Sequence, residues 1–148
     1  DTELDPTTIS QIKEYNDTLT RLNSPELSTL ANTIVYYMKE KEIDDKELHK
    51  RIGLSIAAIE KIYTGKTEKV NIKNVMALCI GLQLDSEECY DMFEKAGYNI
   101  REDTLRNRAY RYLFNNAFLG LKECNKILRY FNQEELPDHK KKLCETEK

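Results

Sequence analysis

Hydrophobic residues recur along most of the chain at intervals of three and four, the spacing of one face of an α-helix. The stretch from residue 25 to 43 shows this clearly, with a broad apolar face made of Leu27, Leu30, Ala31, Ile34, Val35 and Met38. No segment keeps the apolar–polar alternation that is typical of a strand. The pattern therefore predicts an all-α protein.

Start and stop signals divide the central region into short helices. We expect the first to begin at Pro25 after the cap Ser24, and the second to begin with a capping box of Asp44 and Glu47. Gly53 suits a left-handed turn. The later signals are Ser55 and Gly65 for the third helix, Asn71 for the fourth, and the box Asp85 and Glu88 with Gly97 for the fifth. Five helices are thus predicted between residues 25 and 96.

Amphipathic helices are expected on both sides of this region. The helix at 7–22, starting at Thr7 or Thr8, has a narrow apolar stripe that either packs on the domain or pairs with a partner helix. Two more helices are expected within 104–131, joined near Gly120. Their inward stripe should contain Leu105, Ala109, Tyr112 and Leu113, with Arg106, Arg108 and Arg111 in solvent. We divide the chain into 1–24, 25–97 and 98–148.

Charge and composition limit the classes of partner. The net charge is −3 and the pI about 5.5, which disfavours strong non-specific binding of nucleic acid but allows a local basic patch. No apolar run reaches the length of a membrane span, and the first residues lack the pattern of a signal peptide. A start at Asp1 without methionine indicates a trimmed chain or a piece of a longer one.

The sequence contains no motif that is typical of a catalytic or metal-binding site. Cys79, Cys89, Cys124 and Cys144 are widely spaced, and neither His49 nor His139 lies near them in sequence. We therefore expect free thiols in a reducing cytoplasm, with no metal and no cofactor. The absence of a nucleophile motif, a phosphate-binding glycine loop and an HExxH pair argues against an enzyme.

The stretch "KELHKRIGLSIAAIEKIYTGK", residues 46–66, is typical of two short helices joined at a glycine. Eight positions of this stretch, together with the later "VMALCIGLQLD", follow the residue pattern of a known protein family. They are Leu48, Ile52, Gly53, Leu54, Ser55, Ile59, Ile62 and Gly65. On these residues, the segment 25–96 resembles the Cro/lambda-repressor-like (XRE-type) helix-turn-helix family. The resemblance implies a five-helix DNA-binding domain of a bacterial transcriptional regulator that binds double-stranded DNA as a homodimer.

The resemblance also implies where DNA would be contacted. By position, the residues at or near the base edges would be Ser55, Ile56, Ala57, Ala58 and Lys61. Lys46, Lys66 and Lys69 would meet phosphates. We expect the helix after Ser55 to stand free, with Ile56 exposed at the centre of a positive stripe over residues 55–73. That stripe would also include Lys73.

Several positions depart from the family pattern. Residues 56–58 are apolar where side chains that hydrogen-bond base edges are usual, and thymine methyl contacts discriminate less strongly. His49 replaces a small residue that lets the helices pack closely, and Glu60 adds a negative charge. These departures favour an alternative, in which the fold serves as a protein-interaction or dimerisation module of a longer protein.

Overall fold

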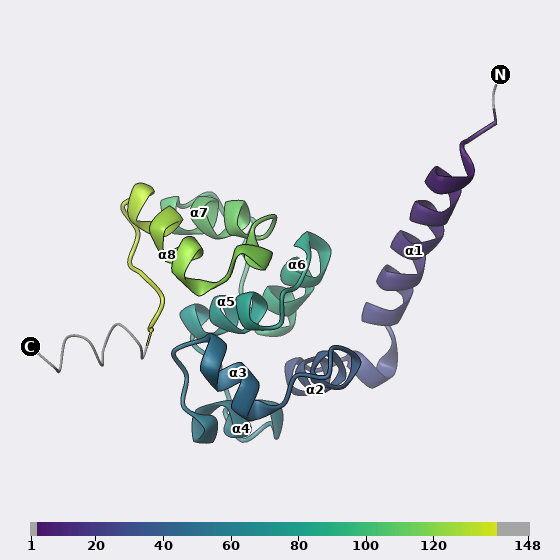
Figure 1. Cartoon of the computed structure of the whole chain (residues 1–148). Coiled ribbons are helices and arrows are strands. Elements are labelled where there is room, and N and C mark those ends of the chain that lie inside the picture. Colours follow the sequence, from purple (N-terminus) through teal and green to yellow (C-terminus); the bar gives the residue numbers. More distant parts are fainter. Residues whose placement is uncertain (1–2, 139–148) are drawn as a thin grey trace, which may run out of the picture.

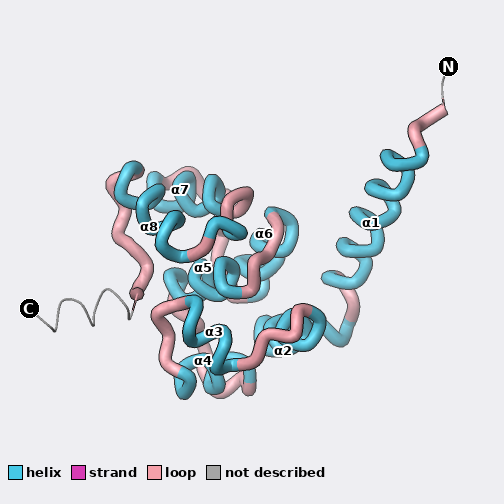
Figure 2. Tube along the Cα trace, viewed as in Figure 1, coloured by secondary structure: helices cyan, strands magenta, loops and turns pink. Residues whose placement is uncertain are grey.

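The computed structural model describes residues 3–138, and within this range every regular element is helical (Figures 1 and 2). The α-helices are α1 (Pro6–Leu22), α2 (Leu30–Glu40), α3 (Asp45–Arg51), α4 (Ile56–Tyr63), α5 (Ile72–Gly81), α6 (Ser86–Lys95), α7 (Leu105–Leu113) and α8 (Leu121–Tyr130). Single 3₁₀ turns, η1 (Pro25–Leu27) and η2 (Ala117–Leu119), precede α2 and α8. The all-α prediction is confirmed. No helix in the described part is long and apolar enough to cross a bilayer.

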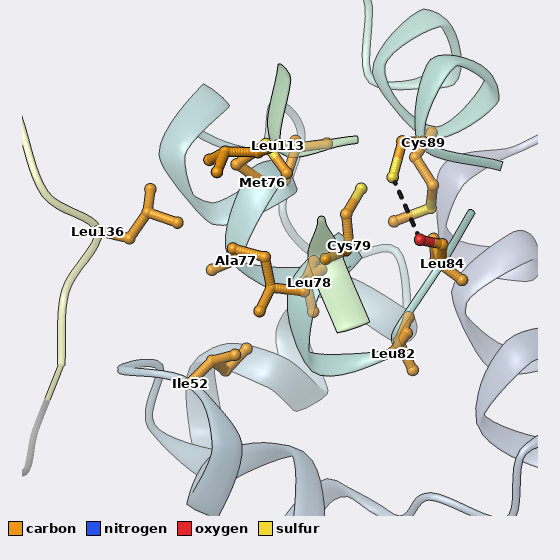
Figure 3. Packing of buried hydrophobic residues seen from close by; sticks show 14 of the residues in the cluster. Ile52, Met76, Ala77, Leu78, Cys79, Leu82, Leu84, Cys89, Leu113 and Leu136 are labelled. Carbon is orange, nitrogen blue, oxygen red and sulfur yellow. Dashed lines mark hydrogen bonds between the residues drawn. The ribbon is translucent and has the colours of Figure 1, made fainter. Parts of the chain in front are cut away.

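Helix α5 lies at the centre of the core. All its residues from Val75 to Gly81 are buried, and it packs against α3, α6, α8 and η2. A Cβ atom added to Gly81 would come within 2.5 Å of Leu48 Cδ1, so this glycine allows α3 and α5 to approach closely. The buried apolar residues form a single cluster, whose members range along the chain from Leu22 to Leu136. Figure 3 shows part of it. The helices after residue 98 therefore share one core with the central region.

Two helix starts differ from the sequence prediction. Asp5 caps α1 by accepting the Thr7 N–H, so α1 starts at Pro6, before Thr7 or Thr8. The helix expected from Pro25 begins only at Leu30. Its cap is Thr29, which accepts the Asn32 N–H at 3.1 Å, whereas Ser24 forms no side-chain cap bond.

The other predicted boundaries mostly hold. Ser55 and Asn71 cap α4 and α5, and Gly65 and Gly97 follow α4 and α6 with positive φ. Asp85 and Glu88 form the full capping box. Asp44 caps α3 alone, because the Glu47 carboxylate pairs with Arg51 at 3.3 Å instead of returning to the cap. Gly53 is not left-handed, so that prediction was wrong.

The reason for a glycine at position 53 is a segment that we name the C-terminal strap, residues 132–138. A Cβ atom on Gly53 would collide with the carbonyl of Pro137 and lie 2.8 Å from the Asp138 nitrogen. The strap follows α8 and runs back toward α3 (Figure 1). Close approach of another backbone therefore replaces the expected turn conformation.

The strap is fastened at two further points. Leu136 is buried and points from the strap toward Ala77 of α5 (Figure 3). The buried Asn125 side chain accepts the Leu136 N–H at 2.8 Å and donates to its carbonyl at 3.1 Å. Lys73 of α5 pairs with Glu134. The strap is thus a packed part of the fold.

Helix α1 is attached at its C-terminal end and extends away from the other helices (Figure 1). The Lys95 ammonium donates to the Leu22 carbonyl at 2.9 Å and to the Thr33 hydroxyl at 3.1 Å, and pairs with Asp91 at 2.7 Å. The apolar residues nearer the start of α1 remain exposed, namely Ile9, Ile12 and Tyr15. The end of the stripe packs on the core, and its beginning is uncovered.

Helix α7 buries Ala109 and Leu113 as expected, but two other residues of the predicted inward stripe are exposed. Leu105 and Tyr112 are 68% and 52% exposed, so their assignment to the core was wrong. The buried residues are Asn107, Ala109, Tyr110 and Leu113. The Asn107 amide donates to the carbonyls of Asn99 and Glu102, and this bonding helps turn the polar side chain inward.

Candidate nucleic-acid interface

Helices α3 and α4 form a compact pair whose inner faces are apolar. Leu48 and Ile52 are fully buried on the α3 side, and Ile59 and Ile62 are buried on α4. Through these residues α4 packs on both α2 and α3. The spacing of the apolar residues therefore fixes which side of α4 faces outward.

The turn between the two helices is held by polar contacts. The Ser55 hydroxyl accepts the Ala58 N–H at 3.1 Å and caps α4. The His49 imidazole Nδ1 lies 2.7 Å from the Leu54 carbonyl oxygen, and donates to it. His49, the departure from the family pattern, thus fastens the chain at the turn.

The far ends of the pair also lie close together. Tyr63 at the end of α4 and Asp45 at the start of α3 line the same small pocket. Partial burial raises the pKa of Tyr63, and the neighbouring carboxylates of Asp45 and Glu60 raise it further. The tyrosine therefore stays protonated and uncharged at neutral pH.

The outward face of α4 carries the residues predicted to approach base edges. Ser55, Ala57 and Lys61 are exposed, Ile56 is 37% exposed, and Ala58 is half-buried. The structure brings these five residues together on one helix and its cap. Glu60 is also exposed, beside Lys61.

The predicted phosphate contacts lie on other elements. Lys46 is exposed on α3, and Lys66 follows α4, with its backbone N–H bonded to the Lys61 carbonyl at 2.9 Å. Lys69 lies further along the same loop. Lys73 contributes little to a positive stripe, because it already pairs with Glu134 of the strap.

The Lys69 ammonium lies over the ring of Tyr98, 4.5 Å from its centroid. The Tyr98 hydroxyl in turn donates to the Val70 carbonyl at 2.6 Å. This cation–π contact orients Lys69 without neutralising it. Sequence reasoning missed Tyr98, because no local signal relates it to a lysine so far away along the chain.

Three of the predicted lysines lack an ionic partner. Within residues 3–138, Lys46, Lys61 and Lys66 form no side-chain ion pair or hydrogen bond. Their charges are therefore not neutralised by a nearby carboxylate. A surface with unpaired ammonium groups and a shallow apolar centre is compatible with a phosphate-bearing duplex.

Comparison with known proteins agrees with this geometry. Residues 33–92, which include α3, α4 and α5, match the family model of the Cro/C1-type HTH DNA-binding domain. This segment is therefore similar to Cro/C1-type helix-turn-helix DNA-binding domains. The resemblance found in the sequence is thereby confirmed. No curated protein and no solved structure matches the chain significantly.

The thiols within residues 3–138 are buried. Cys79, Cys89 and Cys124 are free and buried, and burial raises the pKa of Cys124 to about 12. A hydrogen bond with Cys79, together with burial, raises the pKa of Cys89. Such thiols are unreactive. No group of three potential metal ligands occurs within residues 3–138, and both His139 and Cys144 lie outside them.

Proposed function

We propose that the protein is a transcriptional regulator that binds double-stranded DNA through α4 and acts as a homodimer. The observation that supports this most directly is the uncovered outer face of α4 in a Cro/C1-type domain, with Lys46, Lys61 and Lys66 unpaired in the described residues. In this proposal the start of α4 enters the major groove.

The proposed contacts fall into two classes. Ile56, Ala57 and Ala58 would meet base edges through methyl groups, with Ser55 and Lys61 beside them. Lys46, Lys66 and Lys69 would meet phosphates and set the position of α4 in the groove. This division predicts moderate sequence discrimination on top of a salt-dependent affinity.

The alternative is that the same face binds a protein. Its support is the exposed Ile56 beside Ala57, together with the net charge of −3. An apolar start to the helix would suit a protein partner, and an acidic chain gains little from long-range attraction to DNA.

Binding to a mixed-sequence duplex, followed by fluorescence anisotropy from low to moderate salt, separates the two functions. DNA binding predicts an affinity that falls steeply with salt. Lys66→Ala should reduce the slope of log affinity against log salt by about 1. Lys13→Ala, an exposed lysine on α1, is the matched control and should leave the slope unchanged. No binding even at low salt would favour the protein-binding alternative.

A dimer is proposed because one short helix makes few base contacts, and a pair reads two half-sites. The apolar residues exposed on α1 (Ile9 and Ile12) and on the later helices (Leu105 and Tyr130) offer two surfaces. We favour α1, because its stripe is continuous along a helix that extends from the core. Light scattering should show a dimer that Ile9→Ser with Ile12→Ser converts to a monomer, while Leu105→Ser with Tyr130→Ser leaves it intact. The reverse result would place the dimer on the later helices.

A further inference from the structure

A cleft of about 880 Å³ lies away from the face of α4, between α3, α5, α8 and the strap. Its volume falls in the range of sites for small molecules, about 300–1,000 Å³. Ile80, Leu119 and Leu121 supply its apolar lining, and charged side chains from α3 and α8 surround them. Neither DNA binding nor the proposed dimer uses this cleft.

The charge of the cleft is opposite to that of the whole chain. Lys50, Arg51, Lys122, Lys126 and Arg129 line it, against Glu47, Glu135 and Asp138. Five positive and three negative groups give the lining a net charge of +2, in a chain of net charge −3. A concentration of cations in a concave site favours an anion.

The cations differ in what they already contact. Arg51 pairs with Glu47 and donates to the Gly81 carbonyl at 2.9 Å, and Lys126 pairs with Glu123 at 2.9 Å. Lys50, Lys122 and Arg129 form no side-chain hydrogen bond or ion pair in the part of the chain that the structure describes. These three are therefore available to a ligand.

The first turn of α8 adds to this preference. Its N-cap is Gly120, which has no side chain to accept the first N–H groups of the helix, and φ of +88°. Gly120 lines the cleft, and a Cβ atom there would meet nothing within 4 Å. The positive end of the helix dipole thus lies at the cleft beside Lys122.

We propose that this cleft binds a small amphipathic anion, a carboxylate or phosphate monoester with a hydrocarbon or aromatic body. The head group contacts Lys122, Arg129 and Lys50, and the body lies on Ile80, Leu119 and Leu121. A ligand there touches α3 and borders the strap that packs on Gly53, so it lies against the first helix of the DNA-binding pair. The binding itself does not depend on the proposed function.

The test uses amphiphiles of one chain length and different charge on the ¹⁵N-labelled full chain. Octanoate and octyl phosphate, below their micelle concentrations, should give saturable amide shifts centred on α3, η2 and α8. Octylammonium should give none there. The tighter of the two anions identifies the preferred head group.

Variants then locate the head group. Lys122→Ala and Arg129→Ala should each weaken anion binding about fivefold, as expected for an exposed ion pair. Both side chains are exposed and unpaired, so the remaining amide spectrum should not change. Lys13→Ala is the control and should bind as the parent chain does. Equal shifts with octylammonium, unaltered affinity in both variants, or no saturable shift with either anion would overturn the proposal.

Discussion

Helix α7 and the helix-turn-helix pair both carry several cations, but those cations make different contacts. Arg108 of α7 forms two bonds with Asp103, at 2.5 and 2.7 Å, and Arg111 donates to the Ile100 carbonyl at 2.7 Å. The Arg108 guanidinium lowers the pKa of Asp103. Around α4, in contrast, Lys61 and Lys66 make no such bond within the described residues.

The cations of α7 are therefore engaged in contacts within the protein, whereas those around α4 are available to a phosphate. A phosphate that approaches Arg108 must compete with a two-bond contact to a carboxylate, whereas one that approaches Lys66 replaces only water. Basic residues close in sequence therefore say little about nucleic-acid binding until their partners are known. The predictions below test this comparison, from the largest effect to the smallest.

The largest expected effect is a difference in stability between two leucine variants, one at a buried leucine of α3 and one at an exposed leucine of α7. Leu48 is fully buried, so Leu48→Ala should lower the free energy of unfolding by about 3 kcal/mol. Leu105 is 68% exposed, so Leu105→Ala should change it by less than about 0.5 kcal/mol. Urea denaturation measures both. Similar losses in the two variants would show that the burial assigned to the two helices is wrong.

The strap joins α8 to the turn of the helix-turn-helix pair, and Gly53→Ala should loosen it. The new methyl group would collide with the Pro137 carbonyl, at an expected cost of about 1–3 kcal/mol. Leu136→Ala should also release the strap. The double variant should therefore cost less than the sum of the two single ones. Strictly additive losses in urea denaturation would mean that Gly53 does not act through the strap.

Ile56 tests the apolar part of the proposed interface. On a duplex selected from a random pool, Ile56→Ala should weaken binding by about 0.5–1 kcal/mol, because it removes methyl contacts only. The salt slope should stay the same, since no charge is lost. Tyr112→Ala, a change at an exposed aromatic residue of α7, is the control. An unchanged affinity after Ile56→Ala would remove this residue from the interface.

The smallest effect concerns the half-buried carboxylate of Glu88 rather than an exposed charge. Burial raises the pKa of Glu88, whose carboxylate accepts the Asp85 N–H at 3.0 Å. Its deprotonation thus costs stability as the pH rises, and the cost is complete above the folded pKa. Glu88→Gln keeps the acceptor and removes the charge. At about pH 7 the melting temperature of Glu88→Gln should be slightly higher than that of the parent chain, and at about pH 4 it should be no higher. The melting temperature of Glu87→Gln, the control, should show no such pH dependence.

Local signals in the sequence were sufficient for much of the fold. The caps Ser55, Asn71 and Asp85 act through neighbouring backbone groups, so short spacing reveals them. The same is true of the apolar spacing that places Ile59 and Ile62 inward. The resemblance to the helix-turn-helix family rested on residues of the same stretch, and the family model matches residues 33–92.

What the sequence missed depends on contacts between distant residues. Gly53 is required by Pro137, Lys69 is oriented by Tyr98, and Lys73 pairs with Glu134. None of these pairs is related by helical spacing. The inward face of α7 was predicted only in part for a similar reason, since the amide of Asn107 finds its carbonyl partners in the preceding loop. The DNA contacts of residues 55–69 remain a proposal.

The most direct test of the central claim compares the salt dependence of DNA affinity in two double variants of the full chain. Lys46→Ala with Lys66→Ala should reduce the slope of log affinity against log salt by about 2, because two phosphate contacts are lost. Arg106→Ala with Arg108→Ala, which removes the same charge from α7, should leave the slope as in the parent chain. An equal reduction in both variants, or a reduction only in the second, would contradict the assignment of the DNA-binding surface to α4.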